Sequence, residues 1–122
     1  MSSGISSLTQ AYSIFGHILK SGEKPIWCDT KSLITNERVV ETRGIGNPTV
    51  EFEIPVGEVA KVEYKFNFKE YGIELYSSDG QTYFLSNKLK PTFKSFESAL
   101  LAIQSGEAEA LLSASVQAGD KS

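Results

Sequence analysis

An unbroken alternation of apolar and polar residues runs from Ala60 to Lys69. Its large apolar positions are Val62, Tyr64, Phe66 and Phe68, and charged or amide side chains lie between them. Successive side chains of a strand point to opposite faces, so this period of two predicts a strand with one apolar face and one solvated face. We expect the four large apolar residues to face the core.

Two further strand-like segments follow, at Ile73–Ser77 and Gln81–Ser86. The dipeptide Asp79-Gly80 between them tolerates the positive φ values of a type I′ turn, which is a strong hairpin signal. A turn of two residues would also fix the register of the two strands. The directly opposed pairs would then be Leu75 with Phe84 and Tyr76 with Tyr83.

A helical period replaces the strand period after Pro91. The apolar residues that recur at this spacing are Phe93, Phe96, Leu100 and Ile103. Thr92 is the expected N-cap, because its hydroxyl can accept a backbone N–H bond, and Gly106 is expected just beyond the C-terminal end. An amphipathic helix over Thr92–Gln104 must bury its apolar stripe, and the nearest apolar surface is the face of the preceding strands.

Four earlier segments also have the composition of short strands. They are Ile26–Asp29, Ser32–Thr35, Arg38–Arg43 and Thr49–Ile54. The sequence therefore predicts an α+β fold, in which a strongly bent antiparallel sheet or partly open barrel of six to seven strands is closed by the C-terminal helix.

A second helical stripe precedes the strands, over residues 8–20. Ser7 and Gln10 fit a capping box at its start. The core pattern already has a closing helix, so this extra N-terminal helix needs another apolar surface. That surface could be the outer face of its own sheet, where Tyr76, Tyr83 and Leu85 would project, or it could belong to a second subunit or a protein partner. The residues of this predicted interface are Leu8, Tyr12, Phe15, Ile18, Leu19, Tyr76 and Tyr83.

The length of 122 residues suits one domain with one core, so residues 1–122 are expected to form a single domain. Its core is expected over about 26–104, and the small polar residues of 113–122 suggest a frayed tail. No apolar run is as long as a membrane span, and the N-terminus lacks the pattern of a signal peptide. A cytoplasmic location is therefore expected.

The formal net charge is −3, from 12 basic and 15 acidic residues, and the two signs are interleaved along the chain. A nucleic-acid partner would require a basic surface that neutralises phosphates, so none is expected. The same charge balance argues against strong binding to anionic membranes.

Residues that could carry catalysis or hold a metal are scattered along the chain. Cys28 is the single cysteine and His17 is the single histidine, which disfavours a metal site and excludes an internal disulfide. Glu51 and Glu53 share one face of a predicted strand, where solvation explains them better than acid–base chemistry. We therefore predict no catalytic residues, no cofactor, no metal and no enzymatic activity.

Two local motifs and the order of the elements resemble the pleckstrin-homology-like (PH-like) superfamily, especially its small bacterial and GRAM-type members. The first motif is Leu33–Val40 (LITNERVV), which is similar to a hairpin of leucine, threonine, asparagine, any residue, arginine and an aliphatic residue in those domains. The second is the Asp79-Gly80 hairpin before the closing helix. The resemblance covers about Ile26–Gln104 and implies a curved sheet with one open end plugged by the helix.

The resemblance also implies a binding or assembly scaffold without common catalytic residues. Members that bind inositol phosphates cluster basic residues in the first hairpin, whereas here Lys31, Arg38 and Arg43 are mixed with acidic residues. The first hypothesis is thus a non-catalytic protein-interaction or assembly module, acting through a protein partner or most simply through self-association as a homo-oligomer. The alternative is a domain that binds a small ligand or a lipid headgroup, and a small enzyme of unrecognised type ranks third.

Overall fold

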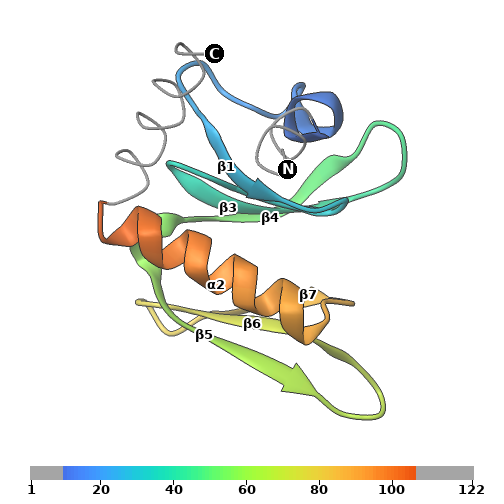
Figure 1. Cartoon of the computed structure of the whole chain (residues 1–122), viewed down its shortest axis with the longest axis vertical. Helices are drawn as coiled ribbons and strands as arrows, with labels where there is room; N and C mark the ends of the chain where they lie inside the picture. Colours follow the sequence, from blue (N-terminus) through green and yellow to red (C-terminus); the bar gives the residue numbers. More distant parts are fainter. Residues whose placement is uncertain (1–9, 107–122) are drawn as a thin grey trace, which may run out of the picture.

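The computed structural model describes residues 10–106, which contain two antiparallel sheets and a C-terminal helix (Figure 1). The four-stranded sheet has the order β1-β2-β3-β4, with bounds Pro25–Cys28, Ser32–Thr35, Arg38–Arg43 and Thr49–Pro55. The three-stranded sheet has the order β5-β6-β7, with bounds Val59–Phe66, Tyr71–Ser77 and Thr82–Ser86. The 3₁₀ turn η1 (Val56–Glu58) joins the sheets, and the helix α2 (Lys90–Gln104) follows them. The predicted α+β fold is confirmed.

Helix α2 runs between the two sheets (Figure 1). Phe93, Phe96 and Leu100 are its buried residues, and they share one apolar core with both sheets. The Phe96 ring meets Trp27 of β1 edge-on, with ring centroids 5.2 Å apart, and the Phe93 ring lies 5.6 Å from Tyr64 of β5. The predicted packing of the helix on the strands is therefore confirmed.

Helix α2 begins at Lys90, before the predicted start. Leu89 is its N-cap and no side chain caps the first turn, so the expectation that Thr92 caps the helix is wrong. Pro91 explains the earlier start, because proline is tolerated in the first turn, where its missing N–H would have no helical partner. The predicted end is confirmed, since Gly106 follows the C-cap with a φ of 86°.

The hairpin between β6 and β7 pairs one residue out of the predicted register. Leu75 lies opposite Tyr83, and Tyr76 lies opposite Thr82. A shift of one residue exchanges the two faces of a strand. Tyr83 therefore shares the inner face with Leu75, and Leu85 is fully buried, so the prediction that these two residues project from the outer face is wrong. Tyr76 does lie on the outer face.

Side-chain bonds at Asp79 account for the change in register. Its carboxylate accepts hydrogen bonds from the Ser77 hydroxyl and the Gln81 amide, while the Ser77 amide donates to the Gln81 carbonyl. These bonds close a connection longer than the two-residue type I′ turn. The Asp-Gly signal thus locates the hairpin correctly but not its length.

Strand β5 ends at Phe66, earlier than the alternating pattern predicts. The Asn67 carboxamide oxygen accepts bonds from the backbone amides of Lys69 and Glu70, which turns the chain at this point. Phe68 is consequently in the loop and 97% exposed, so the prediction that it faces the core is wrong. Phe66 stays on the strand but is 73% exposed, and it too departs from the prediction.

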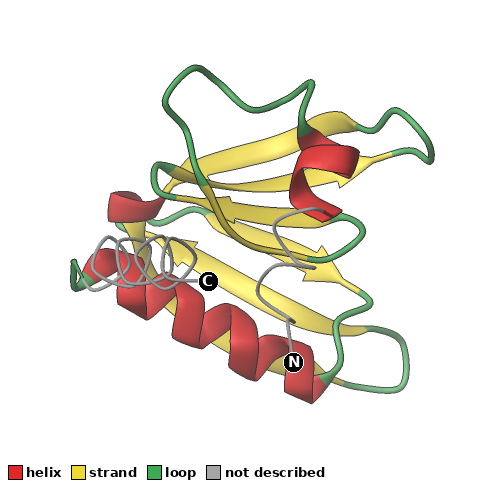
Figure 2. Ribbon diagram, turned by 45° about the horizontal axis from the view of Figure 1, so that its top comes forward, coloured by secondary structure: helices red, strands yellow, loops and turns green. Residues whose placement is uncertain are grey.

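The N-terminal helix, described over residues 10–15, packs on the outer face of the four-stranded sheet (Figures 1 and 2). Ala11 and Phe15 are buried there with Leu33 and Val40, in a cluster separate from the main core. The helix ends at residue 15, earlier than predicted, because the chain turns over residues 16–18, beginning at Gly16. Both faces of β2 and β3 are covered, which explains why nearly all of their side chains are buried.

A buried ion pair anchors the segment after this helix to the sheet. Arg38 of β3 donates to the two Glu23 carboxylate oxygens at 2.7 and 3.0 Å and to the Ile18 carbonyl at 2.9 Å. The Thr35 hydroxyl also donates to Glu23, at 2.7 Å. Burial alone would raise the pKa of Glu23, but the bonds from Arg38, the Lys20 amide and Thr35 lower it from 4.5 to about 2. Thr35 and Arg38 of the LITNERVV motif thus hold the fold together.

The acid stability of the protein is expected to depend on Glu23. Because its pKa is about 2 in the fold and 4.5 ordinarily, Glu23 stabilises the fold fully above pH 4.5 and progressively less as the pH falls toward 2. The shift corresponds to about 3 kcal/mol. Glu23→Gln removes this titration, so between about pH 5 and pH 2.5 the free energy of unfolding should fall more steeply for the wild type than for the variant.

Urea unfolding at several pH values measures this difference. Glu41, whose pKa is raised by its burial, titrates in both proteins and cancels in the comparison. Equal pH slopes for the wild type and Glu23→Gln would contradict the role of Glu23.

Candidate binding surface

The inner face of the β5–β6 hairpin extends beyond the helix that covers it. Tyr64 lies under α2 and contacts Phe93, but Phe66, two residues farther along β5, is beyond the helix. The Phe66 ring lies 6.5 Å from the Tyr64 ring and 6.0 Å from that of Tyr71, its partner across the strands. A row of aromatic rings thus continues from the core onto the surface.

Two more exposed apolar residues belong to the segments next to this row. Phe68 lies in the β5–β6 loop, and Leu89, which is 58% exposed, is the N-cap of α2. Both views place this loop beside the first turn of α2 (Figures 1 and 2), and the Lys90 ammonium lies 5.4 Å from the centre of the Tyr64 ring. We define the hairpin patch as Tyr64, Phe66, Phe68, Tyr71 and Leu89.

The hairpin patch differs from the other apolar side chains on the surface because three of its members, Tyr64, Phe66 and Tyr71, have rings in contact. The exposed large apolar residues of the described chain are Tyr12, Ile45, Val50, Phe66, Phe68, Leu89 and Leu101. Those outside the patch are spread over the N-terminal helix, the β3–β4 hairpin and the far half of α2. Scattered apolar residues are normal on a protein surface, whereas contiguous ones mark interaction sites.

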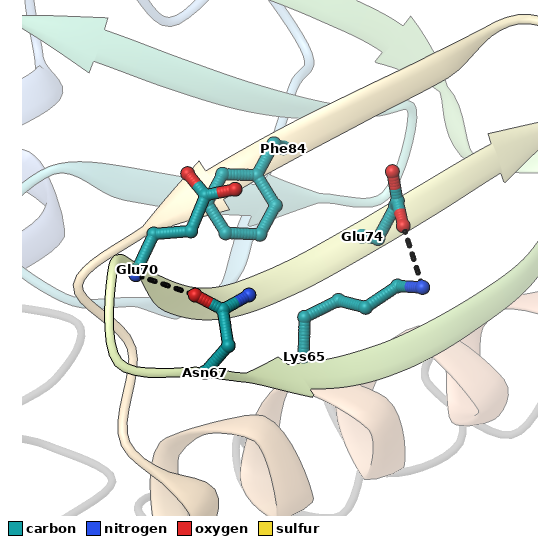
Figure 3. A pocket seen from close by; sticks show the side chains of 5 residues that line it. All are labelled: Lys65, Asn67, Glu70, Glu74 and Phe84. Atoms are coloured by element: carbon teal, nitrogen blue, oxygen red, sulfur yellow. Dashed lines mark hydrogen bonds and ion pairs between the residues drawn. The ribbon is translucent and has the colours of Figure 1, made fainter.

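The outer face of the same hairpin is polar. Lys65, Asn67, Glu70, Glu74 and Phe84 line an open hollow of about 360 Å³ (Figure 3). The Lys65 ammonium lies 3.2 Å from the Glu74 carboxylate, and this bond raises the pKa of Lys65. With one lysine against two carboxylates, the hollow is unsuited to an anionic ligand.

The structure does not bring the predicted interface residues of the N-terminal segment to one exposed surface. Phe15 is fully buried, and Ile18 and Leu19 are half-buried around the same cluster. Tyr12, on the same helix, is 55% exposed. Leu8 lies outside the described residues.

The two predicted interface tyrosines are also separated from this segment and from each other. The Tyr76 hydroxyl lies within hydrogen-bond distance of the Glu63 and Glu74 carboxylates on the outer face. The Tyr83 ring lies 5.1 Å from that of Phe52, on the inner side. A role for the predicted set in an interface stays a prediction, but its members form no single surface among the described residues.

The sequence contains a signal for the hairpin patch, although the alternating pattern hides it. Alternation continues through Asn67 and therefore assigns Phe66 and Phe68 to the core face. The polar residues Asn67, Lys69 and Glu70 around Phe68 indicate a loop instead, which would place Phe68 outside the strand. Phe66 is exposed because α2 does not extend over it. This depends on where α2 packs on the sheet, which the sequence around Phe66 does not indicate.

The other candidate groups are engaged in the fold. Burial and the neighbouring Asp29 raise the pKa of Cys28 to about 11, so its reactive thiolate is scarce at neutral pH. Glu51 and Glu53 form ion pairs with different arginines. Residues 10–106 bring no three His, Cys, Asp or Glu side chains together in a way that could hold a metal ion.

The basic residues of the first hairpins are also paired with acids. Lys31 lies 3.9 Å from Glu41, and Arg43 lies 3.7 Å from Glu51. Arg38 is buried and bonded to Glu23, so its guanidinium cannot reach a ligand at the surface. This arrangement does not form the basic cluster that an inositol phosphate would require.

No family model matches the sequence, and no curated protein matches it. Among solved structures, the fold is similar to that of a DUF1696 family protein with a pleckstrin-homology domain from Shewanella loihica PV-4. The match covers 80% of this chain and 96% of that chain, with a TM-score of 0.55 and 16% sequence identity. The chain therefore has a PH-like fold, as the resemblance around Leu33–Val40 predicts.

Within residues 10–106, no helix is both long enough and apolar enough to span a membrane.

Proposed function

We propose that this chain is a non-catalytic protein-interaction module that binds its partner through the hairpin patch. The observation that carries the proposal is the row of contacting rings from buried Phe93 to exposed Phe66. The PH-like fold favours a binding role. A cytoplasmic location, expected from the sequence, is part of the proposal, and the partner is another protein or a second copy of the chain.

The hairpin patch suits binding without rearrangement. The rings of Tyr64 and Tyr71 both contact the Phe66 ring and restrict its movement. When a partner covers this ring, the Phe66 side chain therefore loses little conformational entropy. Full burial of an aromatic side chain of this size stabilises a complex by about 1.5–3 kcal/mol. Aromatic residues are also enriched among those that dominate binding energies.

Replacing Phe66 with serine is expected to abolish partner binding while leaving the fold intact. Ile45→Ser is the matched control, because Ile45 is a large apolar residue that is fully exposed in the loop between β3 and β4. The immobilised full-length wild type and both variants are incubated with an extract of the source cells, and the bound proteins are quantified by mass spectrometry. We expect at least one protein to be retained by the wild type and Ile45→Ser and reduced about tenfold or more on Phe66→Ser.

Thermal unfolding of the three proteins provides the control for folding. Both replaced side chains are largely exposed, so both variants should unfold within a few degrees of the wild type. An identical set of bound proteins on all three would contradict the proposed function.

A further inference from the structure

Lysines without an ion pair gather around the hairpin patch. Among residues 10–106, the basic residues outside any ion pair are Lys24, Lys69, Lys90 and Lys94. All except Lys24 belong to the two segments that carry the patch, the β5–β6 hairpin and the start of α2. Lys69 follows Phe68 in the β5–β6 loop, and Lys90 and Lys94 lie on the first two turns of α2.

Lys90 lies at the end of α2 where a cation opposes the helix dipole, and its ammonium lies 5.4 Å from the centre of the Tyr64 ring. The first turn of α2 has neither an acidic residue nor a side-chain cap, so its N–H groups and the helix dipole present a partial positive charge. A cation at this end of a helix is destabilising. Lys94, four residues on, adds a second ammonium on the same side of the helix. This end of α2 therefore presents positive charge beside the exposed rings.

Neighbouring acidic residues do not neutralise this charge. Glu70 is in the same loop as Lys69, but its side chain lies on the outer face of the hairpin, beside Phe84 (Figure 3). Glu97 is three residues from Lys94, with which it forms no ion pair, and about two turns from Lys90, or roughly 10 Å along the helix axis. The inner face therefore combines apolar rings with a positive rim, whereas the lysines of the outer face, Lys61 and Lys65, are paired with glutamates.

We infer that the partner presents an acidic peptide segment with aliphatic or aromatic side chains, an inference that rests on the proposed function. The apolar side chains of the segment cover Phe66 and Tyr71, and its carboxylates pair with Lys69, Lys90 and the N–H groups at the start of α2. The observations favour a peptide over an anionic bilayer. The outer face of the same hairpin has its lysines paired with glutamates and the chain has a net charge of −3, so an extended anionic surface finds few further cations, whereas a peptide contacts the inner face alone.

A random-peptide phage library provides the probes for a test. The library is panned against the full-length protein with counter-selection against Phe66→Ser, and the selected peptides are synthesised. Fluorescence anisotropy then measures their dissociation constants for the wild type, for the Lys69→Glu/Lys90→Glu double variant, and for Lys24→Glu. Lys24 is the matched control, since it too lacks an ion pair but lies near the start of β1.

We expect the selected peptides to be enriched in Asp and Glu beside aliphatic or aromatic residues. Their affinity should fall about tenfold or more in the double variant, weaken with added salt, and stay unchanged in Lys24→Glu. Neutral or basic peptides that need Phe66 but bind the double variant as tightly as the wild type would overturn the acidic partner and leave the proposed function standing. If no selected peptide needs Phe66, the proposed function fails as well.

Two further measurements distinguish the other occupants of the patch. Sedimentation with phosphatidylserine-containing vesicles at physiological salt should leave the protein in the supernatant. Co-sedimentation that is lost in the Lys69→Glu/Lys90→Glu variant would replace the acidic peptide with an anionic membrane. Light scattering that shows an oligomer of the wild type and a monomer of Phe66→Ser would replace it with a second copy of this chain.

Discussion

Phe96→Ala is expected to lower the free energy of unfolding by about 3–5 kcal/mol. Phe96 is fully buried where α2 meets the strands, and its ring packs edge-on against Trp27. Truncation removes this contact and leaves a cavity that the surrounding strands can fill only in part. Urea titration followed by tryptophan fluorescence measures the loss.

Lys94→Ala is the control for this prediction. Lys94 is on the same helix but exposed and outside any ion pair, so its truncation should change the stability by less than about 0.5 kcal/mol. Equal losses for Lys94→Ala and Phe96→Ala would show that the apolar face of α2 is wrongly placed.

Arg38→Met is expected to destabilise the protein by about 3–5 kcal/mol. The substitution leaves the Glu23 carboxylate in its buried site without its cation, and it frees the Ile18 carbonyl. The double variant Glu23→Gln/Arg38→Met should recover part of the loss, because it no longer contains an uncompensated buried charge.

Arg43→Met is the matched control for the buried pair. Arg43 is an exposed arginine of the same strand, 3.7 Å from the exposed Glu51, and a surface pair of this kind contributes no more than about 1 kcal/mol. If Arg38→Met and Arg43→Met lose equally little stability, the Glu23–Arg38 pair does not anchor the N-terminal segment.

The identity and order of the elements could be predicted because they depend on local periodicity. The alternation before Phe66 and the helical spacing from Phe93 each follow from neighbours in the sequence. The register of β6 and β7 could not be predicted in the same way. It is set by the bonds that Asp79 makes across the turn, and a change of one residue moves Tyr83 from the outer face to the inner face.

The surface that the N-terminal helix covers had a partial signal in the sequence. Leu33-Ile34 and Val39-Val40 are adjacent apolar pairs, and two neighbouring apolar residues in a strand point to opposite faces. Such pairs indicate strands that are buried on both faces. Phe15 of the N-terminal helix covers Leu33 and Val40 on the outer face. The outer face of the four-stranded sheet, and not that of β6 and β7, therefore receives the helix.

The candidate binding surface was not predictable from periodicity. Phe66 has the pattern of a core residue, and it is exposed only because α2 begins too late along the hairpin to cover it. The lysines around it are far apart in the sequence, and only the fold brings the β5–β6 loop and the start of α2 side by side. The patch is thus a property of the tertiary arrangement.

Photo-crosslinking in living cells tests most directly whether the hairpin patch is a binding surface. The photoreactive residue benzoylphenylalanine replaces Phe66 in one full-length variant and Ile45 in the other, both at exposed positions. After irradiation, we predict a discrete adduct with a protein partner from position 66 and none from position 45. No adduct from position 66, or the same adducts from both positions, would contradict the account.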